Sequence, residues 1–251
     1  MRTERWIICN DQHTPWIDET VHAAFLRFLK HYPPDGFVIN GDFMDGYSFS
    51  RHLTGALDLE MPDKQFITIE KEVSPANDVL DDYDQVLPKG CKKYFIFGNH
   101  EDRIRRWASQ GLNAVFGNFL NPRKLLNLDR RNYITLENYP SAYIEIGSLQ
   151  VSHGSKSTVN VAKANLDEYR HSIATGHAHT AQLAYVGGIG TKQVGITIPC
   201  MADMKSKGME YQKNTGRSVQ GWLVVNVEGK KFWPELIVGH DKRFFYGGKE
   251  I

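Results

Sequence analysis

The feature that most constrains the fold is a recurring pattern in which a short apolar run ends in a cluster of polar residues. It occurs five times, in the segments WIICNDQH, DGFVINGDFMD, KKYFIFGNHED, SLQVSHGS and SIATGHAHT. Apolar runs of this length that are rich in β-branched and aromatic residues and bounded by turn residues are typical of buried strands. The pattern therefore predicts a sheet whose strands end in polar loops.

Helix patterns lie between several of these runs. Apolar residues at helical spacing predict a first helix that covers residues 21–29 and begins after Asp18 or after Thr14. Further helices are expected within residues 68–86 and at 160–170. Strands that alternate with helices at this spacing favour parallel βαβ units and an α/β fold.

The second half of the chain is richer in strand patterns. The segments that predict strands there are YITLEN, SAYIEIG, LQVSHG, QLAYVGG, GITIPC and the hairpin GWLVVNVEGKKFWPELIV, which turns at Glu228-Gly229. The sequence contains no internal repeat, low-complexity tract or linker. We therefore expect residues 1–251 to form a single α/β domain with packed sheets.

Composition excludes several classes of protein. A net charge of +1 gives the whole chain no electrostatic attraction to nucleic acid or to an anionic membrane. Cys9, Cys91 and Cys200 are too few and too scattered for a disulfide framework or a thiolate metal site. No apolar run is long enough to span a membrane, and MRTERWIICN lacks the apolar segment of a signal peptide. A cytoplasmic protein with no membrane contact is expected.

Charge is less even along the chain. Residues 58–84 carry nine acidic side chains and two lysines, and residues 101–131 carry a net charge of +4. The basic stretch forms an insert at about 102–131 that also contains Trp107, Phe116 and Phe119. Arginines beside aromatic rings could grip a phosphate backbone and stack on bases. The favoured alternative is a helix with a solvated basic side and an apolar side packed on the core.

The polar residues that follow the predicted strands share one chemistry. In open α/β folds, function collects at the carboxyl ends of strands. The carboxylate, imidazole and amide side chains at those positions are Asp11, His13, Asp42, Asp45, Asn99, His100, His153, His177 and His179. Such nitrogen and oxygen donors suit a borderline metal such as Mn, Fe or Zn, and neither a thiolate zinc site nor an all-oxygen calcium site is present.

These residues also form five ordered motifs. The chain contains DQH at 11–13, GDFMD at 41–45, GNHE at 98–101, HG at 153–154 and GHAH at 176–179. The full set, in this order, resembles the blocks D-x-H, G-D-x-x-D, G-N-H-E/D, H-G and G-H-x-H of the calcineurin-like metallophosphoesterases. The resemblance implies a four-layer α/β/β/α sandwich of two mixed β-sheets flanked by helices.

The resemblance also implies two divalent metal ions held by facing loops. By motif position, Asp11, His13 and His179 would hold one ion, and Asn99, His153 and His177 the other, while Asp42 would bridge both. Mn²⁺ is the expected metal, with Fe, Zn or Ni as alternatives. Two adjacent cations lower the pKa of a bridging water, so that hydroxide can attack phosphorus in line with the leaving oxygen.

Two motif residues have other roles in the family. The position of His100 points at the substrate and stabilises or protonates the leaving oxygen, and Asp45 would hydrogen-bond to His100 and orient it. Two more cationic side chains are candidates for contacts with the substrate: Arg103, which begins the basic insert, and His52, which follows the second motif.

The substrate class is the least determined part of this interpretation. In the Ser/Thr protein phosphatases of the family an arginine follows the second motif, whereas Gly46 and Tyr47 follow Asp45 here. A diester carries less charge than a monoester and needs fewer cationic contacts, so the sequence favours a phosphodiesterase, with a DNA or RNA nuclease as one form of it. A phosphomonoesterase acting on proteins or small molecules is the alternative, and a scaffold without catalysis is a third interpretation.

Overall fold

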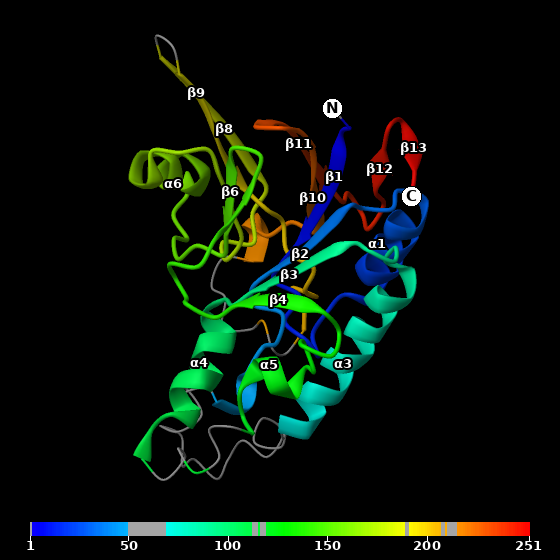
Figure 1. Cartoon of the computed structure of the whole chain (residues 1–251), viewed down its shortest axis with the longest axis vertical. Coiled ribbons are helices and arrows are strands. Elements are labelled where there is room, and N and C mark those ends of the chain that lie inside the picture. Colours follow the sequence, from blue (N-terminus) through cyan, green and yellow to red (C-terminus); the bar gives the residue numbers. More distant parts are fainter. Residues whose placement is uncertain are drawn as a thin grey trace.

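In a computed structural model, the chain folds into two β-sheets that face each other, with helices on the outer side of each sheet (Figure 1). The structure describes residues 2–49, 69–111, 115, 119–188, 191–206, 209 and 215–251. The layers run helices, sheet, sheet, helix. The four-layer sandwich of mixed sheets implied by the motif resemblance is confirmed.

The first sheet has the strand order β11-β10-β1-β2-β3-β4. Its strands are β1 (Glu4–Cys9), β2 (Gly36–Asn40), β3 (Lys92–Ile96), β4 (Tyr133–Leu136), β10 (Gly221–Glu228) and β11 (Lys231–Val238). Strands β1 to β4 are parallel, and β10 and β11 add an antiparallel hairpin beside β1. The predicted hairpin around Glu228-Gly229 is confirmed.

The second sheet has the order β5-β6-β7-β9-β8. Its strands are β5 (Ile144–Ile146), β6 (Leu149–Ser152), β7 (Ile173–Thr175), β8 (Gln182–Gly188) and β9 (Thr191–Thr197). β9 begins at Thr191, although the sequence pattern placed this strand at 195–200. Its first residues are polar because β8 and β9 form an arm that projects beyond the body of the sheet (Figure 1).

Three helices cover the sheets where the sequence predicted them. They are α1 (Glu19–His31), α3 (Ile69–Val86) and α6 (Val161–Tyr169). Asp18 caps α1, because its Oδ1 accepts hydrogen bonds from the N–H groups of Thr20 and Val21 at 3.0 and 3.2 Å. Helices α1 and α3 lie side by side on the first sheet, whereas α6 covers the second (Figure 1).

Six further elements belong to the described part of the chain. They are η1 (Tyr47–Phe49), α4 (Asn99–Ala108), α5 (Pro122–Leu125), η4 (Thr215–Arg217), β12 (Phe245–Tyr246) and β13 (Lys249–Glu250). None of the described helices combines the length and the apolar character that a bilayer span requires.

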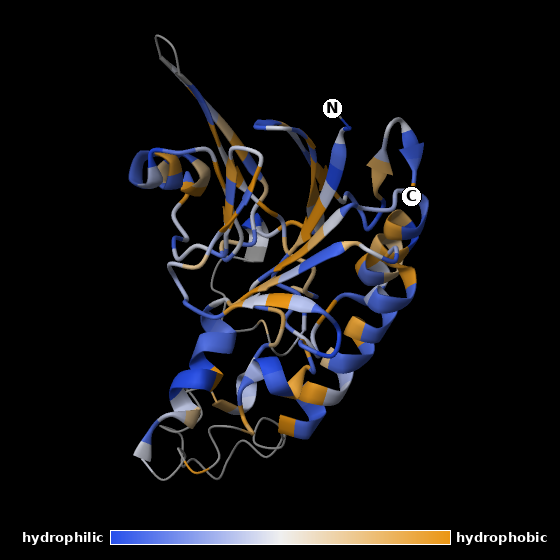
Figure 2. Ribbon diagram, viewed as in Figure 1, coloured by the Kyte–Doolittle hydropathy of each residue, from blue (hydrophilic) through white to orange (hydrophobic). Residues whose placement is uncertain are grey.

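Two apolar layers hold the sandwich together. One lies between the first sheet and its helices and contains Phe25, Phe28 and Trp222; the other lies between the two sheets and contains Ile8 and Val225. Figure 2 shows the corresponding apolar stripes along the strands of both sheets and along parts of α1 and α3. Because the central strands are buried on both faces, their sequences are continuous apolar runs without alternation.

Candidate metal centre

The five motifs meet where the strands of both sheets end. The loops after β1 and β2 run together, since the N–H of Asp11 donates to the carbonyl of Gly41 and that of His13 to the carbonyl of Asp42, both at 3.0 Å. A bond between the sheets closes the site: the N–H of His177 donates to Asp11 Oδ2 at 2.9 Å. Loops from both sheets therefore surround one buried region.

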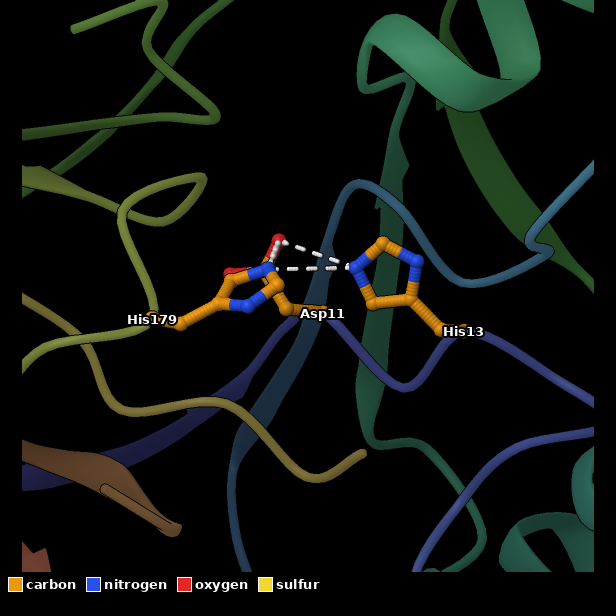
Figure 3. A group of neighbouring side chains, drawn as sticks. All are labelled: Asp11, His13 and His179. Carbon is orange, nitrogen blue, oxygen red and sulfur yellow. Dashed lines mark hydrogen bonds and ion pairs between the residues drawn. The ribbon is translucent and has the colours of Figure 1, made fainter. Parts of the chain in front are cut away.

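Asp11, His13 and His179 form a first cluster (Figure 3). The Nε2 atoms of the two histidines lie 3.1 Å apart, and Asp11 Oδ1 lies 3.4 Å from His179 Nε2 and 3.9 Å from His13 Nε2. Asp11 Oδ1 is buried and accepts no hydrogen bond. A buried carboxylate oxygen without a donor is costly unless a cation or proton lies beside it.

A second cluster forms around Asp42. Its Oδ2 lies 3.2 Å from His153 Nε2, which lies 3.3 Å from Asn99 Oδ1. His177 Nδ1 lies 2.8 Å from the same amide oxygen. His153 is oriented from behind by its Nδ1, which donates to the carbonyl of Asn40 at 2.7 Å. That bond leaves Nε2 facing the cluster, as is usual for a metal-binding imidazole.

His100 lies beside both clusters. Its Nε2 is 3.8 Å from Asp42 Oδ2, and its Nδ1 contacts the backbone carbonyl of Asp45 and lies 3.4 Å from the Oδ1 of that residue. The same Asp45 Oδ1 lies 3.1 Å from His13 Nδ1. One carboxylate therefore orients two imidazoles, His13 as well as the predicted His100. Arg103, one turn further along α4, places Nη2 3.5 Å from His100 Nε2.

The backbone of the loops is unusual. Five of the seven predicted metal ligands have positive φ angles between 48° and 66°: Asp11, His13, Asp42, His177 and His179. This left-handed conformation costs residues other than glycine about 1 kcal/mol each and is concentrated at functional sites. His177 and His179 would point to opposite faces of a strand, but these turns direct one to each cluster.

Two motif glycines are required by close approach. A Cβ atom on Gly98 would lie 2.1 Å from Asp42 Oδ1, and a Cβ atom on Gly176 would lie 3.0 Å from Asp11 Oδ2. Both glycines therefore allow the backbone of one loop to pass directly against a carboxylate of another.

Glu101 locks two of the loops together. Its carboxylate is fully buried and accepts four backbone N–H bonds, from Asp42, Phe43, Met44 and Gly98, at 2.9–3.0 Å. These donors belong to the second and third motifs. The carboxylate therefore sets the distance between Asp42 and the loop that carries Asn99 and His100.

The buried carboxylates control the charge of the histidines. Burial disfavours a protonated His100, but Asp42 and Asp45 outweigh that effect and raise the pKa of His100 to about 9. Burial likewise opposes protonation of His153, and the adjacent Asp42 raises the pKa of His153 to about 10. For His177, burial and the nearby His153 lower the pKa to about 4. The centre thus favours positive charge next to Asp42.

The structure brings together every predicted site residue that it describes. The seven predicted metal ligands, the catalytic candidates His100 and Asp45, and Arg103 lie in the clusters above or beside them. His52 lies outside the described residues. Sequence reasoning missed three contributors: Glu101, Asn10, whose Nδ2 donates to Asp11 Oδ2, and Tyr139 beside His153. Of these three, only Glu101 could have been identified from the sequence, because it is the last residue of the GNHE motif.

Several charged residues of the basic insert form ion pairs, either with the acidic stretch or within the insert. Arg131 forms ion pairs with Asp81 and Asp84 of α3 at 2.6 and 2.7 Å. Other pairs within the insert join Arg105 to Asp102, Arg106 to Asp102 and Arg123 to Asp129. Trp107 packs against Phe49 at 5.1 Å between ring centres. These contacts agree with the favoured interpretation of a helix whose apolar side packs on the core.

The motifs, the fold and the geometry agree with a match to a known family. The model of the calcineurin-like phosphoesterases matches residues 5–190, so the chain belongs to that family. A comparison with curated proteins finds no match.

Several solved structures are similar to the chain over nearly its whole length. An uncharacterized protein from Streptococcus pneumoniae, titled a predicted phosphoesterase, is 12% identical, with a TM-score of 0.40 and coverage of 100% of this chain and 98% of its own. Vacuolar Protein Sorting 29 from Cryptosporidium parvum is 10% identical, with a TM-score of 0.48 and coverage of 100% and 96%. Yfce, a phosphoesterase from E. coli, is 9% identical, with a TM-score of 0.41 and coverage of 96% and 97%.

Replacing Glu101 tests the locking of the two loops. We expect Glu101→Gln to lower the free energy of unfolding by about 3 kcal/mol, because an amide NH₂ would face backbone donors and leave buried groups unpaired. Urea denaturation of the metal-free protein measures the change. Glu70→Gln, at an exposed position on α3, is the matched control and should change stability by less than about 0.5 kcal/mol. Equal effects of the two substitutions would contradict the role of Glu101.

Proposed function

We propose that the protein is a phosphoesterase that depends on two divalent metal ions and prefers phosphodiesters. The observation that carries this proposal is the pair of adjacent clusters in which buried carboxylates face imidazole nitrogens. Membership of the calcineurin-like phosphoesterase family supports the same reaction class. The near-complete burial of Asp11 and Asp42 demands compensating positive charge, which metal ions supply.

The donor set fits such ions. Asp11 Oδ1, which accepts no hydrogen bond, lies beside two imidazole nitrogens, and His153 is held from behind with Nε2 facing Asp42. We assign one ion to Asp11, His13 and His179, the other to Asn99, His153 and His177, and a bridging role to Asp42. Nitrogen and oxygen donors suit Mn²⁺, with Fe, Zn or Ni as alternatives.

Divalent ions bound there would activate water for attack on phosphorus and neutralise charge on the phosphoryl oxygens. His100 acts on the leaving group. Its Nδ1 is engaged by Asp45, its Nε2 faces the centre, and the adjacent carboxylates of Asp42 and Asp45 raise its pKa above the ordinary value for an imidazole. A protonated Nε2 can donate its proton to the leaving oxygen as the ester bond breaks. Asp45 holds the ring in the orientation that this transfer needs.

Nucleic acid is the less supported class among diesters. A backbone-binding surface needs several unpaired cations, and most arginines of the insert are engaged by carboxylates. A small-molecule diester requires only the centre itself. A scaffold role is disfavoured because each family ligand position and His100 carries the residue that catalysis needs.

One observation favours a phosphomonoesterase as the second candidate. Arg103 places its guanidinium 3.5 Å from His100 Nε2, and no carboxylate among the described residues forms an ion pair with it. It can bind the additional charge of a monoester from α4, although the arginine that follows the second motif in the protein phosphatases is absent here.

Metal content tests the assignment of the ligands. Purified protein that is stripped and reloaded with Mn²⁺ should retain two ions per chain by elemental analysis. His179→Ala should retain about one, because it removes an imidazole from the first cluster alone. His240→Ala is the control, since that side chain is 97% exposed, and it should retain two. Wild-type protein that takes up no stoichiometric metal would contradict the proposal.

Replacement of His100 tests proton transfer separately from metal binding. His100→Ala should keep both ions and lower kcat for diesters by about 10²- to 10⁴-fold. The loss should be larger for diphenyl phosphate than for bis(p-nitrophenyl) phosphate, because the nitrophenolate leaves without needing a proton. His31→Ala, on the exposed side of α1, is the control. An equal decrease in kcat for both substrates would contradict the role of His100 as the general acid.

Arg103 distinguishes the two substrate classes. With Mn²⁺, we expect the wild type to turn over bis(p-nitrophenyl) phosphate faster than p-nitrophenyl phosphate. Arg103→Ala should raise KM for the monoester about tenfold and for the diester about threefold, since the dianion gains more from a charged contact. Arg106→Ala, on the same helix and paired with Asp102, should change neither. Faster turnover of the monoester by the wild type would contradict the phosphodiesterase and support the phosphomonoesterase. Cleavage of DNA by the wild type would support a nuclease.

A further inference from the structure

The loop after β4 brings an aromatic side chain to the centre. β4 lies beside β3 in the parallel part of the first sheet, so its carboxyl end opens on the same edge as the motif loops. Tyr139 lies in this loop, three residues beyond the end of β4 at Leu136. Its ring centre is 6.0 Å from that of His153, at an interplanar angle of 59°.

The loop that carries Tyr139 is held in place. The N–H of Tyr139 donates to the carbonyl of Glu137 at 3.0 Å, and the N–H of Ala142 donates to the carbonyl of Asn138 at 2.8 Å. The carboxylate of Glu137 in turn lies 3.5 Å from Arg123 Nη1, in the basic insert. These contacts hold the backbone of the loop that carries Tyr139.

Tyr139 is placed differently from Trp107 and Phe119, two of the aromatic residues that the sequence suggested; Phe116 lies outside the described residues. The ring of Trp107 packs against Phe49 at the core, and Phe119 is 74% exposed on the insert. Tyr139 is half-buried, with His153 beside it and part of its surface open. A flat ring held next to an imidazole of the centre can stack on another flat ring while the phosphate binds.

We propose that Tyr139 forms the wall against which the non-reacting organic group of the substrate stacks, so that the enzyme prefers phosphodiesters with a flat aromatic or heterocyclic group. This inference rests on the proposed function, since the metal centre defines where the phosphate lies. Asp42 Oδ2 lies near both His100 Nε2 and His153 Nε2, at 3.8 and 3.2 Å. Arg103 adjoins His100, to which we assign the leaving oxygen, whereas Tyr139 adjoins His153. Leaving group and retained group are thus recognised by different residues.

Two diesters with the same leaving group test the wall. Methyl p-nitrophenyl phosphate and phenyl p-nitrophenyl phosphate differ only in the retained group. The wild type should favour the phenyl ester about tenfold in kcat/KM, the size expected of one stacking contact. Tyr139→Leu, which keeps an apolar side chain but no flat ring, should reduce the ratio to near one, and Tyr139→Phe should preserve it. Tyr143→Ala, at an exposed position nearby, is the control and should not change the ratio.

A binding measurement separates this inference from the proposed function. Calorimetry of the Mn²⁺-loaded protein with phenylphosphonate and methylphosphonate should show about tenfold tighter binding of the phenyl compound, lost in Tyr139→Leu. Tighter binding of phenylphosphonate without hydrolysis of either ester would contradict the proposed activity but support the stacking role of Tyr139. Hydrolysis of both esters with no preference, or a preference unchanged in Tyr139→Leu, would overturn the role of Tyr139. Failure to bind either phosphonate would also overturn it.

Discussion

Buried negative charge is the constraint on which the rest of this structure depends. Asp11, Asp42, Asp45 and Glu101 are each at most 2% exposed, and all lie at one edge of the sandwich. An isolated carboxylate in such surroundings is strongly destabilising, so each must be compensated. The structure uses different means: backbone N–H groups for Glu101, and imidazoles for Asp45, Asp11 and Asp42.

This compensation explains why the loops adopt a strained backbone. A regular strand would direct alternate side chains away from the centre, whereas left-handed residues turn successive ligands inward. Five such residues cost about 5 kcal/mol in total, a large fraction of the stability of a typical domain. The two apolar layers of the sandwich offset this cost, because strands buried on both faces anchor the ends of every ligand loop.

Sequence reasoning identified the architecture well because the determining signals are local. An apolar run followed by polar turn residues marks a strand end wherever it occurs, and the resemblance of the ordered motifs to the calcineurin-like family implied that the loops after those ends face one another. The same kind of signal offered Asp18 or Thr14 as the start of the first helix, and the structure has Asp18 as the cap. The start of β9 was misplaced because its first residues are polar and project from the body on the β8–β9 arm.

Contacts between distant segments were beyond sequence reasoning. Whether Glu101 faces solvent or the second motif depends on how α4 is rotated against the loop after β2, and no local pattern records that rotation. The pairing of Arg131 with Asp81 and Asp84 likewise depends on the approach of two segments about fifty residues apart, so two charge runs that suggested exposed surfaces partly cancel instead. Tyr139 belongs to none of the sequence motifs. It lies at the centre because β4 pairs with β3, and the sequence did not reveal that pairing.

The position of Asp42 links these observations to selectivity. Its Oδ2 lies 3.8 Å from His100 Nε2 and 3.2 Å from His153 Nε2, so a phosphate held beside it would meet two unlike flanks, one at His100 and one at His153. The flank of His100 carries the guanidinium of Arg103, a cation that suits an oxygen that gains negative charge as it leaves. The flank of His153 carries a flat ring, which suits a group that stays uncharged. A centre of this kind would orient an unsymmetrical diester before any bond breaks, and its selectivity would arise from the two flanks and not from the metal ligands.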